Sequence, residues 1–291
     1  MGVLQSSCVV TAEAAPPPAA LAVLSESDFP DGGAVASETA AALPVFAAIP
    51  RSSAYTRTFS SPVFRGEDLV TVNSSAVVVK HVSDVTKFMS ALAHLTTSAS
   101  AKNGVIKQFE KEFSSANATV VSARMVRARV LRFPNQAVDF AVAMKYSTGV
   151  TLNVGELWVG EGSTLSFTVY LAKVFTAGDS VGLAQAVDRH IQIASATVPP
   201  TNGAPPGVSG TPQVSQTVSA VLGTWTGKAE MEIQWLRCSP TGSQCIAISG
   251  ATAPTYLVVA GDVGSTLEVD VTATNGAGTT SAESAPSTAV V

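Results

Sequence analysis

The stretch 235–278 constrains the fold of this 291-residue chain more than any other segment. Its two cysteines, Cys238 and Cys245, enclose six residues, and Pro240 and Gly242 among these are suited to turning the chain. A zinc site would need further cysteine or histidine ligands nearby, and this segment has none. We therefore predict a Cys238–Cys245 disulfide that closes a hairpin, which places the chain outside the reducing cytosol.

The last third of the chain also has a regular strand spacing. Short alternating runs recur about every ten residues, which is the spacing of a β-sandwich. Asn275-Gly276 lies between two such runs and is a strong hairpin turn. The predicted strands are 216–221, 232–237, 246–248, 255–259, 267–273 and 279–284.

This part resembles the bacterial immunoglobulin-like repeats at the ends of large actinobacterial surface proteins. The residues that carry the resemblance are GTW (223–225), QWLRC (234–238), the cysteine spacing, ISGAT (248–252), TY (255–256), DVG (262–264) and ATNGAG (273–278). The resemblance implies an all-β immunoglobulin-like sandwich over 208–291. It departs from antibody domains because no cysteine pair joins the sheets and Thr266 stands where a tyrosine corner needs Tyr.

Paired prolines separate this part from the rest of the chain. Pro199-Pro200 and Pro205-Pro206 stand among Gly, Ser and Thr, a composition typical of a semi-extended linker. We place the linker at 196–207, with one domain before it, 21–195. Residues 1–20 are expected to be the disordered remnant of a signal peptide whose upstream portion is truncated or missing.

The first domain alternates between helical and strand periodicity. A helix is expected from Ser83, and its apolar residues Val85, Phe88, Met89, Leu92 and Leu95 form one stripe. A second helix is predicted near 101–113 and a closing helix from Asp179. Between them, alternating runs near 126–130, 138–146, 150–159 and 165–171 predict successive antiparallel strands with one face in water. The predicted fold is α+β, an antiparallel sheet with helices on one face.

This first domain resembles the secreted or lipid-anchored sensor-like domains of actinobacteria, which have a PsbP-like α+β layout. The resemblance is carried by LSESDFPDG (24–32), AYTRTFSSPVF (54–64), the helix at 83–95 and GDSVGLAQAVDRHIQIA (178–194). Those domains have no agreed catalytic residues, so the resemblance implies none here.

Charge and motif content restrict the function. The chain has 17 basic and 21 acidic residues, which gives no basic footprint for nucleic acid. No apolar window approaches the roughly 20 residues of a transmembrane helix. The three histidines lack zinc-ligand spacing, and no nucleophile elbow, phosphate loop or dinucleotide fingerprint occurs. We predict no catalytic residue, no metal site and no cofactor.

Two alternatives remain open. Asp139, Glu156 and Glu161 lie on or near strands and would serve an envelope hydrolase if two of them converged, although Asp139 is better placed to pair with Arg127 or Arg129. Trp225 follows a turn and is the candidate contact for a stacked sugar ring. The favoured interpretation is a monomeric, non-enzymatic protein of the cell envelope or extracellular space. Its α+β module would bind a small ligand or envelope component, and its sandwich would act as spacer or adhesion element, with carbohydrate binding through the sandwich as the alternative.

Overall fold

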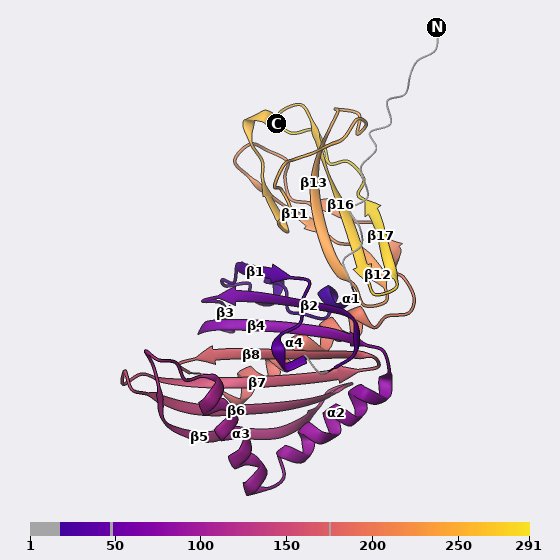
Figure 1. Ribbon diagram of the computed structural model, residues 1–291. Helices are drawn as coiled ribbons and strands as arrows, with labels where there is room; N and C mark the ends of the chain where they lie inside the picture. The colour runs from indigo at the N-terminus through magenta and orange to yellow at the C-terminus, as the bar shows by residue number, and fades with distance from the viewer. Residues whose placement is uncertain (1–17, 47–48, 175) are drawn as a thin grey trace.

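The computed structural model describes residues 18–46, 49–174 and 176–291. It is mostly β, and its named strands pair antiparallel. Figure 1 shows one large sheet, built by residues up to 172, and smaller sheets built after residue 200 that lie beyond the β1 edge of the large one. We call these the N-terminal part and the C-terminal part. Most of the predicted leader, 1–17, lies outside the described residues, whereas its last three residues fall in a short helix (Pro18–Leu21) with Ala19 and Ala20 buried, so they are not disordered as predicted.

The large sheet has the strand order β1-β2-β4-β8-β7-β6-β5, with β3 paired to β4 off this path. Strands β5 to β8 form a meander that starts at the far edge and returns to β4, which confirms the predicted run of antiparallel strands. The strands are β1 (Val35–Thr39), β2 (Arg51–Ser60), β3 (Val63–Phe64), β4 (Glu67–Val79), β5 (Val120–Arg132), β6 (Gln136–Tyr146), β7 (Thr151–Glu161) and β8 (Thr164–Ala172).

Helices cover both faces of this sheet, so the prediction of helices on one face is wrong. Helices α2 and α3 pack on one face around a core that includes Trp158. Helices α1 and α4 pack on the opposite face around a second core that includes Leu183. The helices are α1 (Pro18–Leu21), α2 (Val82–Leu95), α3 (Ala99–Glu112) and α4 (Ala177–Ala194), with short 3₁₀ turns η1 (Glu26–Asp28) and η2 (Pro44–Phe46).

The error has a physical cause in the side chains under α4. Ser166 and Thr168 alternate with large apolar residues, so the pattern predicts that they face water, yet both are fully buried. Small side chains let a helix approach the sheet closely. The hydroxyls form hydrogen bonds within the sheet. For example, Ser74 Oγ and Thr168 Oγ1, on neighbouring strands, lie 3.3 Å apart.

The C-terminal part contains three small antiparallel sheets: β10-β11-β15, β12-β9 and β14-β13-β16-β17. The first and third share one core, centred on the fully buried Trp235. Its elements are β9 (Thr201–Ala204), β10 (Gly207–Ser209), β11 (Thr217–Val221), β12 (Thr224–Thr226), β13 (Glu230–Cys238), β14 (Ile246–Ala247), β15 (Thr255–Leu257), η3 (Ala260–Asp262), β16 (Thr266–Asn275) and β17 (Gly278–Glu283).

The segment predicted as a linker, 196–207, is partly strand. Thr201–Ala204 forms β9 and pairs with β12. The four residues between the two proline pairs keep their backbone N–H groups, so they can join a ladder that the prolines themselves cannot. The segment therefore anchors the C-terminal part directly after α4.

Candidate functional site

A cleft of about 660 Å³ lies between α4 and the segment 222–231 of the C-terminal part. One wall is a single face of α4, because its residues follow helical spacing. The other wall is the segment around β12. The α4 residues are Gln185, Asp188, Arg189, Gln192 and Ile193, and the opposite residues are Leu222, Gly223, Trp225, Gly227, Lys228, Ala229 and Met231, with Pro134 at one end.

Trp225, the predicted ligand contact, lines this cleft. Its indole Nε1 donates to the carbonyl of Leu222 at 2.8 Å, so the ring orientation is fixed and its polar atom is already satisfied. Gly223 and Gly227 flank it at φ +77° and +76°, a backbone conformation that favours glycine. The half-buried ring is held by a turn-strand-turn unit, packs partly against the C-terminal core and lines the cleft with the rest of its surface.

The α4 wall is polar, and its groups are connected to one another. Asp188 is buried and accepts hydrogen bonds from Asn135 Nδ2 at 2.7 Å and from Gln192 Nε2. Gln192 in turn accepts from Lys228 Nζ, which crosses to the opposite wall. Arg189 pairs with Asp28 of η1. The cleft thus combines an aromatic ring with amide, carboxylate and guanidinium groups held in place before a ligand arrives.

Beside the cleft, the buried His190 lies between two carboxylates. Its Nε2 is 2.7 Å from Asp28 Oδ2, and its Nδ1 is 3.5 Å from Glu230 Oε2. Burial by itself raises the pKa of Asp28, but the hydrogen bond and charge of His190, the Ser25 amide and Arg189 together hold that pKa below its ordinary value. Sequence reasoning missed this group because Asp28 and His190 are 162 residues apart.

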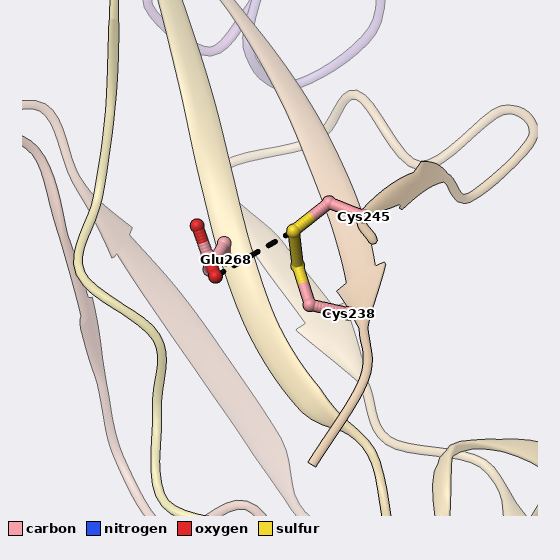
Figure 2. A group of neighbouring side chains, drawn as sticks. All are labelled: Cys238, Cys245 and Glu268. Atoms are coloured by element: carbon pink, nitrogen blue, oxygen red, sulfur yellow. Dashed lines mark hydrogen bonds between the residues drawn. A yellow bond between two sulfur atoms is a disulfide. The ribbon is translucent and has the colours of Figure 1, made fainter. Parts of the chain in front are cut away.

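The predicted disulfide between Cys238 and Cys245 is present and closes the turn between β13 and β14 (Figure 2). Glu268 on β16 lies against it, with Oε1 3.6 Å from Cys245 Sγ. Burial and the charge of Glu283 raise the pKa of this carboxyl. The potential metal-ligand atoms, the two cysteine Sγ atoms and a Glu268 carboxylate oxygen, lie within 4.8 Å of one another. In this structure the two sulfurs are bonded together, and metals bind thiolates, so the group does not form a metal site while oxidised.

The carboxylates considered for hydrolysis do not converge. Asp139 faces α4, where it accepts from Arg127 Nε at 3.2 Å, Arg129 Nε at 3.0 Å and Ser180 Oγ at 2.9 Å, which confirms the expected arginine pairing. Glu156 has the opposite strand parity and lies on the α2–α3 face. Glu161 binds Asn135 at the far end of β7.

Glu156 has an unusual environment of its own. Burial and the charge of Glu112 raise its pKa to about 7, although a hydrogen bond from Trp158 Nε1 at 3.4 Å acts in the other direction. Glu112 lies at the end of α3, so this carboxyl sits under the helical layer and away from the cleft. It is a partly buried titratable group on the α2–α3 face of the sheet.

A second, smaller hollow of about 490 Å³ lies between α2 and the loop before β2. Its lining is mostly apolar and includes Ile49, Val85 and Phe88, with Asp84 and Lys87 at the rim. His81 and His94, which flank and end α2, are exposed. None of the described helices is long and apolar enough to span a membrane.

No family model and no curated protein matches this chain.

Proposed function

We propose that this chain is a non-enzymatic binding protein of the extracellular space or cell envelope, and that its ligand occupies the cleft between α4 and Trp225. In this proposal an α+β module and an immunoglobulin-like sandwich each contribute one wall. The observation that carries it is the cleft itself, in which Trp225 faces the polar side of α4. The disulfide supports the location, because such bonds persist in oxidising compartments.

A carbohydrate is the ligand class that these groups favour. Sugar rings stack their C–H faces on an indole, and their hydroxyls pair with planar amide, carboxylate and guanidinium groups. The described charges of the α4 wall already hold partners within the protein: Asp188 binds amides, and Arg189 binds Asp28. The wall therefore presents polar groups of fixed orientation beside the Trp225 ring, which favours a saccharide.

The test is an oligosaccharide array followed by calorimetry on the strongest hit. Trp225→Ala should weaken binding about tenfold or more, and Trp225→Phe should retain most of it because a ring face remains. Leu257→Ala removes an exposed apolar side chain of the C-terminal part outside the cleft and serves as the control. Binding that is unchanged in Trp225→Ala would refute the proposal.

The second candidate is adhesion through the C-terminal part alone, which the position of Trp225 on β12 also favours. The α4 wall distinguishes the two. Gln185→Ala removes an amide from that wall and leaves Trp225 in place. A loss of affinity of about threefold or more supports a ligand held between both walls, and unchanged affinity supports adhesion through the C-terminal part.

A further inference from the structure

The two parts of the chain meet through contacts around the end of α4. Gly276, in the turn between β16 and β17, donates its N–H to the Ile193 carbonyl at 2.9 Å. A Cβ at this position would collide with the Ala194 backbone, so only glycine fits. Asn275 Nδ2 donates to the carbonyl of Val198 at 2.9 Å. His190 and Glu230 provide a further contact across the same junction.

The hydrogen-bond partners of Asp28 determine what His190 does there. Asp28 Oδ2 accepts from the Ser25 N–H at 2.8 Å, and its Oδ1 pairs with Arg189, so this carboxylate acts purely as an acceptor. Nε2 of His190, 2.7 Å from the same carboxylate, must therefore carry a hydrogen. The other nitrogen, Nδ1, faces Glu230 Oε2. In neutral imidazole it would present a lone pair to that carboxylate, and in imidazolium it presents N–H.

Charged groups from three parts of the chain lie around His190. Asp28 lies on η1, Asp188 and Arg189 on α4, Lys228 in the loop before β13, and Glu230 at the start of that strand. Asp188 is engaged by Asn135 and Gln192, and Lys228 by Gln192. Arg189 is engaged by Asp28. This leaves Asp28 and Glu230 as the two groups that contact the ring, and both are anionic acceptors when ionised.

We propose that His190 is a proton-binding site that fastens the C-terminal part to α4, and that its protonation controls the cleft. The imidazolium bridges Asp28 and Glu230; loss of the Nδ1 proton turns the Glu230 contact from attraction to repulsion. Because Glu230 lies directly between the cleft residues Ala229 and Met231, release of this contact loosens the wall that carries Trp225, which Lys228 and Gly276 still hold to α4. The effect on the ligand rests on the proposed function, whereas the junction itself does not.

The experiment is hydrogen exchange of the ligand-free protein at about pH 6 and about pH 9, the range over which histidine changes charge. Protection of segment 222–231 and of the Gly276 amide is expressed relative to the core strand β6 at each pH, which removes the intrinsic dependence of exchange on pH. In the wild type this ratio should fall about threefold to fivefold at the alkaline pH, the scale expected for a partly exposed ion pair. In Glu230→Gln it should be low at both pH values.

Glu232→Gln is the matched control, because it removes an exposed carboxylate from the same strand and should behave like the wild type. Nitrogen-15 spectra of the imidazole provide an independent readout that does not require a variant of the buried histidine. They should show both ring protons on His190 when the junction is closed and one when it is open. A wild-type ratio that is constant across this range, a Glu230→Gln protein that keeps the wild-type response, or a singly protonated ring in the closed junction would each overturn the proposal. No ligand is used, so failed saccharide binding and a failed junction are separate results.

Discussion

Removal of the Cys238–Cys245 disulfide should destabilise the C-terminal part and leave the N-terminal part unaffected. The bond closes a loop of only eight residues, counting both cysteines, for which the chain-entropy estimate is about 2.5 kcal/mol. The loop keeps some order without it, because Ser239 N–H donates to the Ser243 carbonyl and Gly242 N–H to the Ser239 carbonyl, each at 2.8 Å. We therefore expect a loss of about 2 kcal/mol, equivalent to a melting temperature about 10 °C lower for a unit of this size.

The assay is thermal and urea unfolding of Cys238→Ala/Cys245→Ser, a pair that places alanine at the buried position and serine at the exposed one. Each part has its own fluorescent reporter, since Trp235 lies in the C-terminal core and Trp158 in the N-terminal core. Reduction of the wild type should reproduce the shift, and reductant should not change the variant. A loss below about 0.5 kcal/mol, or an equal shift of the Trp158 transition, would refute this reasoning.

Three further predictions concern the N-terminal core and the compartment. Asp139→Asn leaves the guanidinium groups of Arg127 and Arg129 without their buried counter-charge and should cost about 2–3 kcal/mol in urea unfolding; an unchanged midpoint would contradict the role given to this ion pair. Burial raises the pKa of Glu156 from 4.5 to about 7. The contribution of this group to the free energy of unfolding should therefore be fully present below about pH 4.5 and be lost as the pH rises through about 7. Glu156→Gln should remove this decline, worth at most about 3 kcal/mol, and a slope that persists in the variant would assign it to another group. Protein isolated from its native host should contain the bonded cysteine pair by mass spectrometry; two free thiols there would end the argument for an oxidising compartment.

Much of the fold could be predicted from local pattern. The meander β5 to β8 follows from apolar residues at period two, and α2 from a stripe at helical spacing. What the pattern could not provide was the second covered face. Ser166 and Thr168 are polar residues of the size that fits beneath a helix, and nothing local separates that from exposure to water.

The candidate site could be predicted only in part. Trp225 was found because it follows a glycine turn, which is a local signal. The opposite wall also carries a local signal in the sequence, a polar stripe at helical spacing formed by Gln185, Asp188, Arg189 and Gln192. No local signal in the sequence predicts the contact of Asp28 with His190, because this contact depends on how η1 packs against α4. Tertiary packing brought these residues together.

The central claim is that a saccharide binds against Trp225, and the tryptophan indole signals test it most directly. The chain has three tryptophans; Trp158 and Trp235 are 2% and 0% exposed, whereas Trp225 lines the cleft. Titration with the strongest array hit should shift the indole N–H resonance of Trp225 progressively to saturation and leave the other two in place. Saturable binding in which the Trp225 resonance does not move would contradict the account.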